Sequence, residues 1–240
     1  MLLALWSAKG GSGTSVLAAA CAITLARDPM GVGATCIVDL AGDQPAVFGL
    51  SADPALGLVD WLGAGPAAPT DALDRLLVDV APGVRLLPHG GRDRPDTAAL
   101  PLAESGAALA VALGDAPVPA VADCGTASDP ATRAVVEVAA VSIVVLRGCY
   151  LALRRAVHNA ALAATAGAVL LDEPGRTLST KDISEVLGVP VLARVPVKPL
   201  IARSVDAGVV ATRLPEPLAR AASGLLERVG MRDKRKGAAA

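Results

Sequence analysis

The sequence has few aromatic residues and few histidines. Its 240 residues include one phenylalanine, one tyrosine, two tryptophans and two histidines. So few rings offer no stacking platform for single-stranded nucleic acid. With only His89 and His158 available, the chain offers few histidine ligands for a zinc site and few candidates for the histidine of a catalytic triad. These shortages argue against a zinc enzyme, a triad hydrolase and a single-strand binder.

Cysteines are also scarce, and no two of them form a C-x-x-C pair. The four are widely spaced, and each lies within or beside an apolar segment: Cys21, Cys36, Cys124 and Cys149. This placement predicts buried free thiols in preference to metal ligands.

The chain lacks a charge excess and a long apolar run. Its formal net charge of −1 excludes a globally basic nucleic-acid footprint, so any DNA contact would have to be local. No run of ~20 uninterrupted apolar residues stands outside a strand-turn-helix pattern, so no membrane span is expected. Residues 1–6 carry no basic leader and predict a first strand in preference to a signal peptide. We expect a cytoplasmic protein.

Short apolar runs alternate with longer stretches rich in Ala and Leu, which is typical of β-α units around a buried, mostly parallel sheet. The predicted fold class is therefore α/β, a doubly wound sheet with helices on both faces. Strands are expected at residues 2–7, 34–39, 84–88, 119–123, 141–146, 168–171 and 189–194. Helices are expected at residues 14–27, 56–62, 97–113, 130–139, 151–164, 180–187 and 217–229.

The pattern predicts one domain over residues 1–231. Residues 232–240 combine a charge cluster with Gly-Ala-Ala-Ala and have nothing to bury, so a disordered basic tail is expected there.

A glycine-rich segment lies between the first strand and the first helix. In such a loop the glycines let successive N–H groups converge on phosphate oxygens, and the following helix adds the positive end of its dipole. A hydroxyl at the last position can ligate Mg²⁺. The alternative is a strand-to-helix turn without a ligand. The candidate phosphate-binding residues are Gly10, Gly11, Ser12, Gly13, Thr14 and Ser15, with Ser15 as a metal ligand.

Thr14 occupies the position at which an ordinary phosphate loop carries lysine. Losing one charge-assisted contact costs ~1.5–3 kcal/mol, or roughly ten- to a hundred-fold in affinity. Nucleotide binding tolerates the loss of this lysine better than catalysis does. In catalysis a positive charge is needed where negative charge develops in the transition state.

The run Lys9-Gly10-Gly11-x-Gly13-x-Ser15 resembles the deviant Walker A box of the ParA/MinD family of P-loop ATPases, including its CpaE/TadZ pilus-positioning branch. The resemblance implies the P-loop fold, ATP and Mg²⁺ as cofactors, and a homodimer. It also implies that Lys9 reaches the partner's nucleotide as a catalytic residue.

Two later segments also resemble the family. Residues 37–46 are similar to its second strand and switch segment, which makes Asp39 a catalytic residue by resemblance. The family's water-orienting Asp falls on Ala41, with Asp43 two residues further on. Residues 119–125 resemble the Walker B strand, with Asp123 supporting Mg²⁺. The alternatives are a strand-end carboxylate capping a turn for Asp123 and solvated loop acids for Asp39 and Asp43.

The C-terminal third is similar to the family's adenine-flanking region. By resemblance, the loop at Pro196 borders the adenine, whereas the family's adenine-contacting Asn is replaced in the neighbourhood of Asp172. The departures at Thr14, Ala41 and Asp172 all weaken nucleotide handling.

The resulting hypothesis is a positioning protein that binds ATP·Mg²⁺, dimerises around it and hydrolyses it weakly or not at all. Its expected partners belong to a pilus, division or partition machine. The alternative is a nucleotide-free pseudo-ATPase scaffold. The amphipathic helix at residues 217–229 either packs on the sheet or touches a membrane peripherally. A DNA role would need a shared face for Arg133, Arg147, Arg154, Arg155 and Arg203.

Overall fold

The computed structural model describes residues 1–91 and 102–232, which form an α/β domain around one eight-stranded sheet. The strand order is β3-β4-β2-β5-β1-β6-β7-β8. The strands are β1 (Leu2–Trp6), β2 (Thr35–Asp39), β3 (Val78–Ala81), β4 (Val84–Leu87), β5 (Ala120–Asp123), β6 (Val141–Arg147), β7 (Gly167–Asp172) and β8 (Val191–Pro196).

All pairings in the sheet are parallel except that of the edge strand β3, which runs antiparallel to β4. β1 lies at the centre between β5 and β6, and the chain leaves it toward β2 on one side and later crosses to β6 on the other. In open α/β sheets, ligands bind at the carboxyl ends of the strands where the winding reverses. This topology places the end of β1 at that point.

Alternation along the buried strands creates two hydrophobic cores. Leu2, Ala4 and Trp6 of β1 belong to the core on one face of the sheet, whereas Leu3 and Leu5 belong to the core on the other. All five side chains are fully buried, as expected of a central parallel strand covered on both sides.

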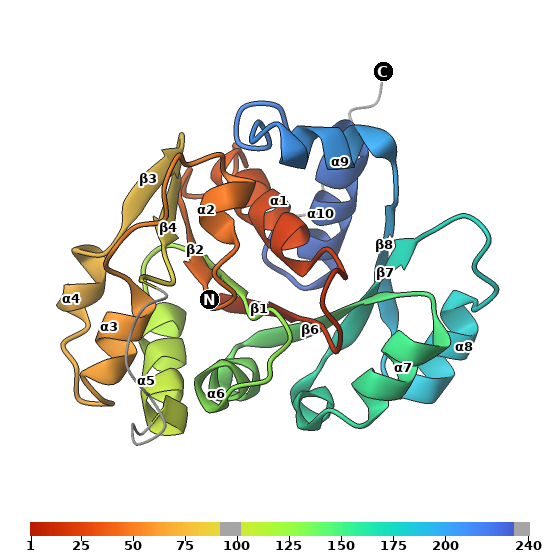
Figure 1. The fold of residues 1–240 in the computed structure, drawn as a ribbon, viewed down its shortest axis with the longest axis horizontal. Coiled ribbons are helices and arrows are strands. Elements are labelled where there is room, and N and C mark those ends of the chain that lie inside the picture. The colour runs from red at the N-terminus through yellow and green to blue at the C-terminus, as the bar shows by residue number, and fades with distance from the viewer. Residues whose placement is uncertain (92–101, 233–240) are drawn as a thin grey trace.

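Helices cover both faces, as Figure 1 shows. One layer contains α1 (Thr14–Ala26), α2 (Gln44–Val47), α9 (Pro199–Asp206) and α10 (Glu216–Arg228). The other contains α3 (Leu58–Gly63), α4 (Asp71–Asp74), α5 (Leu102–Asp115), α6 (Pro130–Val138), α7 (Tyr150–Val157), the 3₁₀ helix η1 (Ala160–Ala164) and α8 (Thr180–Leu187). The predicted fold class is therefore confirmed.

The seven predicted strands are all present, but several other expectations need correction. The edge strand β3 and the helices α2, α4 and α9 were not predicted. The helix expected at 151–164 is two elements, because Asn159 caps η1 by accepting the Ala161 N–H (3.0 Å). Of the helix expected at 97–113, residues 97–101 lie outside the described part of the chain.

Arg232 was assigned to the tail, and this boundary is wrong. Its side chain is 6% exposed and lies 3.2 Å (Nε to Oδ2) from the carboxylate of Asp28, so it belongs to the folded domain. Residues 233–240 lie outside the described part of the chain. The apolar face of α10, including Leu218, Leu225 and Leu226, is buried beside α1 and β8. No helix within residues 1–91 and 102–232 is long and apolar enough to cross a membrane.

Candidate functional site

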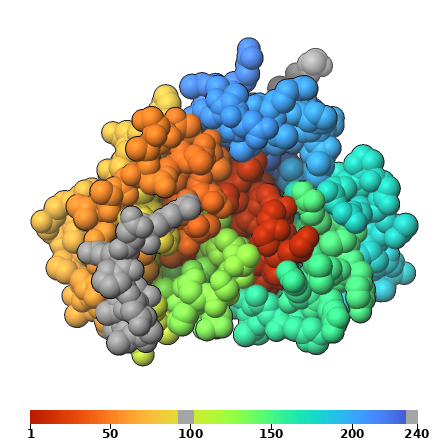
Figure 2. Space-filling view, in the orientation of Figure 1, coloured from red at the N-terminus to blue at the C-terminus, as the bar shows by residue number. Residues whose placement is uncertain are grey.

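A cavity of about 750 Å³ opens at the carboxyl ends of β1, β2 and β5. Its walls come from the loop after β1, the segment after β2, residues 124–129 after β5, and the last residues of α9. In Figure 2 the red N-terminal segment reaches the surface near the middle of the face, bordered by orange, green and blue segments. The cavity therefore lies at the position predicted from the topology of the sheet.

The glycine-rich loop has the backbone geometry of an anion site. Gly11 and Gly13 both have φ of +73°, a conformation that glycine adopts without strain, and Gly13 is the N-cap of the 13-residue helix α1. The hydroxyls of Ser12 and Ser7 both donate to the Lys9 carbonyl, at 2.7 and 3.1 Å. The loop is thus held with the helix N-terminus facing the cavity, where negative groups are stabilised.

Thr14 lies in this wall and has an unpaired hydroxyl. The residue is 5% exposed and lines the cavity, and its Oγ1 is buried without a hydrogen-bond partner in the described part of the chain. Leaving a buried hydroxyl unpaired costs about 1–3 kcal/mol, so a ligand oxygen at this position would recover free energy. Lys9 is half-buried, and it is not part of the cavity wall.

Asp39 lies beneath the segment that follows β2. It is fully buried, and its carboxylate accepts four backbone N–H groups. Oδ1 accepts those of Ala41, Gly42 and Asp43 at 3.1, 2.6 and 3.3 Å, and Oδ2 accepts that of Gln44 at 3.1 Å. Burial and then the charge of Asp123 raise the pKa of Asp39 to about 6, against the opposing effect of its backbone donors. This carboxylate therefore shapes the segment that carries Asp43.

Asp123 is also fully buried, and Gln44 joins it to Ser15 at the start of α1. The Gln44 Nε2 donates to Asp123 Oδ2 at 2.8 Å and to the Ser15 carbonyl at 3.0 Å. The Gly125 N–H donates to Asp123 Oδ1 at 3.2 Å. Burial raises the pKa of Asp123, whereas the side chains of Ser15 and Gln44 lower it. Asp123 and Gln44 thus lock the end of β5 to the start of α1.

Gln44 was not singled out from the sequence. Its signal is faint: a polar residue directly after an acid, followed by Pro45 and an apolar run. Its Oε1 is buried and has no hydrogen-bond partner among the described residues.

The Ser15 hydroxyl lies beside a carboxylate in the cavity wall. Its Oγ donates to Asp43 Oδ2 at 3.4 Å, and both residues line the cavity. Asp43 is exposed, in contrast to the two buried aspartates behind it.

The residues expected around an adenine are not part of this cavity. Pro196 ends β8, and Asp172 forms an ion pair with Arg194 at 2.7 Å (Oδ2 to Nη2). Glu173 pairs with Arg147 and Arg176 at 3.1 and 2.8 Å. None of these side chains lines the 750 Å³ cavity. Base contact through Pro196 stays a prediction.

The arginines considered for DNA are distributed over both layers. Arg203 is on α9, whereas Arg133, Arg154 and Arg155 are on α6 and α7 across the sheet (Figure 1). Arg147 is already paired with Glu173.

Comparison with solved structures identifies the architecture. A ParA family ATPase from Chlorobium tepidum matches with a TM-score of 0.76 and 19% identity, over 92% of this chain and 95% of its own. MinD from Pyrococcus horikoshii, solved with Mg-ADP, matches with a TM-score of 0.75 and 20% identity, over 98% and 97%. This chain has the ParA/MinD fold. The Aquifex aeolicus MinC:MinD complex also matches, with a TM-score of 0.74 and 18% identity, over 97% and 96%.

The ParA/MinD fold accounts for the arrangement of the cavity, in which the loop after β1 faces the segments after β2 and β5. No protein-family model matches the sequence, and neither does any curated protein. Identities at this level establish a shared fold, and the activity must be argued from the site.

Proposed function

We propose that this chain is a positioning protein of the ParA/MinD family that binds ATP with Mg²⁺ and dimerises around it. The observation that carries the proposal is the unpaired, buried hydroxyl of Thr14 at the glycine-capped N-terminus of α1. Helix N-termini bind phosphate through their free N–H groups, and this one opens into a large cavity. The Mg-ADP in P. horikoshii MinD supports the same ligand class here.

The residues of the loop fit the two cofactors. The backbone of Gly10–Gly13 and the Thr14 hydroxyl would hold phosphate oxygens, and the Ser15 hydroxyl would contact Mg²⁺, which takes oxygen ligands. Bound Mg²⁺ neutralises charge on the phosphates. Asp39 keeps the segment after β2 in place, and Asp123 orients Gln44 and the loop from below. By resemblance to the family's signature lysine, Lys9 would act on the nucleotide of a partner subunit, and it does not line its own cavity.

Hydrolysis is proposed to be weak or absent. Thr14 brings no positive charge to the transferring phosphate, and Ala41 brings no carboxylate to an attacking water. The role would then be that of a nucleotide-controlled switch in the placement of a pilus, a septum or a chromosome, as in the CpaE/TadZ branch. Protein partners are part of the proposal, supported by the MinC:MinD complex. We place the protein in the cytoplasm, where Arg-rich patches or the C-terminal helix α10 would make a peripheral membrane or DNA contact.

A second candidate is a scaffold that binds no nucleotide. The bonding of Asp39 and Asp123 favours it, because protein donors already occupy both carboxylates. The unpaired Thr14 hydroxyl favours the switch.

Calorimetric titration with ADP and ATP in the presence of Mg²⁺ separates the two. The wild type should bind saturably, and Thr14→Lys should bind roughly ten- to a hundred-fold tighter, because it adds a charge-assisted contact. Lys9→Ala should leave binding to the single chain unchanged and weaken nucleotide-dependent dimerisation. Lys181→Ala, which removes an exposed lysine on α8, is the matched control. Failure of both wild type and Thr14→Lys to bind millimolar nucleotide would leave only the scaffold.

A further inference from the structure

Among the described residues, the wall of the nucleotide cavity carries negative charge and no basic side chain. The carboxylates that line it are Asp43, Asp129 and Asp206, and none of the described lysines, arginines or histidines does. Asp129 is committed to capping α6, where it accepts the Thr132 N–H at 2.9 Å. The α1 N-terminus offers only about half a positive charge. A free nucleotide therefore meets net repulsion that the usual loop lysine would offset.

Of Asp39, Asp43 and Asp123, only Asp43 is exposed to the cavity. Asp39 and Asp123 are fully buried and bonded to protein donors. Asp43 is exposed on the cavity wall, and its Oδ2 lies 3.4 Å from the Ser15 Oγ. Its backbone N–H donates to Asp39 Oδ1, so the buried carboxylate fixes where Asp43 stands.

A hydroxyl and one carboxylate suit Mg²⁺ when phosphates complete its ligands, because Mg²⁺ is bound through one or two carboxylates together with substrate phosphates and water. No group of three or more acidic, His or Cys side chains able to hold a metal occurs within residues 1–91 and 102–232. The cation therefore needs phosphate oxygens to complete its set of ligands. Because position 14 carries no lysine, the phosphates in turn need the charge of the cation.

We propose that Asp43 and Ser15 together hold the divalent cation, and that nucleotide binds this chain only as its metal complex. The inference rests on the proposed function and adds two points to it. Asp43 is a ligand of the cation, and the cation must neutralise phosphate charge before the nucleotide can bind. The unpaired Thr14 hydroxyl is the neutral contact that remains for the phosphates once the metal has supplied the charge.

The test is calorimetry of ADP binding with Mg²⁺ and with excess chelator, combined with electron paramagnetic resonance of Mn²⁺ bound with ADP. Wild type should lose roughly a hundred-fold or more of its ADP affinity without metal. Thr14→Lys should recover metal-free binding, because the ammonium replaces part of the missing charge.

Asp43→Asn should weaken Mn²⁺ binding with ADP about ten- to a hundred-fold. Asp79→Asn is the matched control: it removes the same charge from the exposed edge strand β3, outside the cavity, and should leave Mn²⁺ affinity close to that of wild type. Circular dichroism of both variants checks that they remain folded.

The outcomes are distinguishable. Equal ADP affinity with and without metal would overturn this inference and leave nucleotide binding intact. So would an Asp43→Asn variant that binds Mn²⁺ as the wild type does. Absence of nucleotide binding by wild type and Thr14→Lys under every condition would overturn the proposed function as well.

Discussion

At the scale of single residues, the four thiols differ in reactivity because they differ in burial. Burial raises the pKa of Cys21 and Cys36 to about 12 and that of Cys124 well above its ordinary value. Cys149, just before α7, is only half-buried. Thiolates are the reactive form, so protonated, buried thiols are inert.

We therefore predict that a thiol reagent at pH 8 modifies Cys149 alone in the native protein and all four cysteines after denaturation. Mass spectrometry of the intact chain measures the number of adducts. Cys149→Ser should remove the native reaction, and rapid modification of Cys21 in the native state would contradict the burial described.

Both the backbone conformation and the surroundings of Gly13 disfavour a side chain at this position. Its φ of +73° disfavours a side chain, and an added Cβ would lie 3.1 Å from Leu171 Cδ2. We predict that Gly13→Ala lowers the free energy of unfolding by about 1–2 kcal/mol and weakens nucleotide binding, because the left-handed conformation becomes costly. Urea denaturation measures the first effect.

Gly224→Ala is the control for this substitution. Gly224 lies inside α10 and an added Cβ there meets nothing within 4 Å, so alanine should stabilise by about 1 kcal/mol through helix propensity. Equal effects of the two substitutions would show that the loop tolerates alanine.

At the scale of elements, α8 begins with a reciprocal cap. Asp182 Oδ2 accepts from the Ser179 N–H and Oγ–H at 2.8 and 2.7 Å, and the Asp182 N–H donates to Ser179 Oγ at 3.2 Å. Hydrogen bonding from the Ser179 side chain, and then from its backbone, lowers the pKa of Asp182. A lowered pKa in the fold contributes stability above the unfolded pKa of 3.8, and this stability is lost as the pH falls through the folded value.

We predict that Asp182→Asn destabilises the protein at pH 7 and that its difference from wild type shrinks as the pH falls below about 4. Denaturant unfolding at pH 7 and at acid pH provides the comparison. Glu185→Gln on the same helix breaks only an exposed pair with Lys181 (3.7 Å) and should change little at pH 7. A pH-independent effect of Asp182→Asn would refute the assigned cause.

The sequence predicted the long elements better than the short ones. Seven strands were recognisable because buried parallel strands are continuous apolar runs. α2 and α4 have four residues each, too few for a helical period to appear, and β3 is a half-exposed edge strand of four residues. The glycine-rich loop before α1 could be located because its glycines, hydroxyls and helix are contiguous, and its phosphate binding stays a prediction.

The rest of the site depends on contacts that no local pattern encodes. Gln44 and Asp123 are 79 positions apart, and their bond requires β2 and β5 to be neighbours. Asp39 was predicted as catalytic by resemblance to the family's switch segment, and this resemblance does not reveal that its oxygens accept four backbone N–H groups.

At the scale of the whole molecule, a buried ion pair fastens Arg232 to the end of α1. Asp28 and Arg232 have side chains 9% and 6% exposed, with 3.2 Å between Oδ2 and Nε. Arg232 also donates to Ser223 on α10. Removing one partner of a buried pair leaves an uncompensated charge, which is strongly destabilising.

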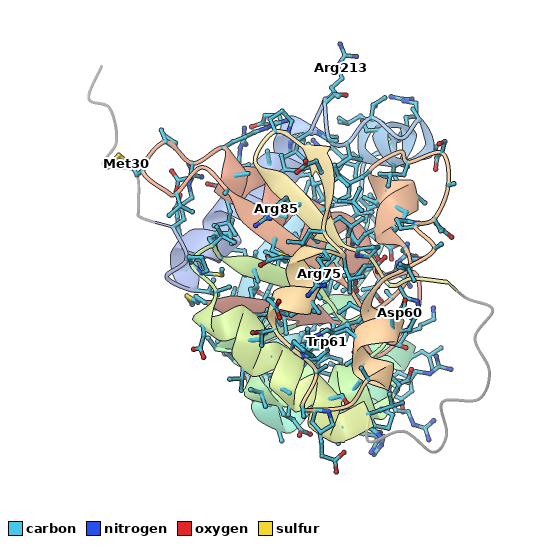
Figure 3. The ribbon with its side chains drawn as sticks, turned by 90° about the vertical axis from the view of Figure 1, so that its left-hand side faces the viewer. Met30, Asp60, Trp61, Arg75, Arg85 and Arg213 are labelled. Carbon is cyan, nitrogen blue, oxygen red and sulfur yellow. The ribbon has the colours of Figure 1, made fainter. Side chains whose placement is uncertain are left out.

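We predict that Arg232→Met lowers the free energy of unfolding by about 3–5 kcal/mol, and that adding Asp28→Asn restores part of it. Urea denaturation of both single variants and the double variant completes the cycle. Arg75→Met is the control, because Arg75 (Figure 3) forms an exposed pair with Asp71 worth about 0–1 kcal/mol. Simple additivity of the two substitutions would contradict a coupled pair.

The two indoles give the molecule a built-in optical probe. Trp6 is fully buried at the end of β1 and donates from Nε1 to Thr165 Oγ1 at 3.0 Å, and Trp61 is 4% exposed and donates to the Pro69 carbonyl at 2.9 Å. Both are shielded from water in the fold, so global unfolding shifts their emission to the red. Replacing Trp61 by Phe leaves Trp6, the last residue of β1, as a single fluorophore. Ligand-induced strain in β1 then becomes visible without a label.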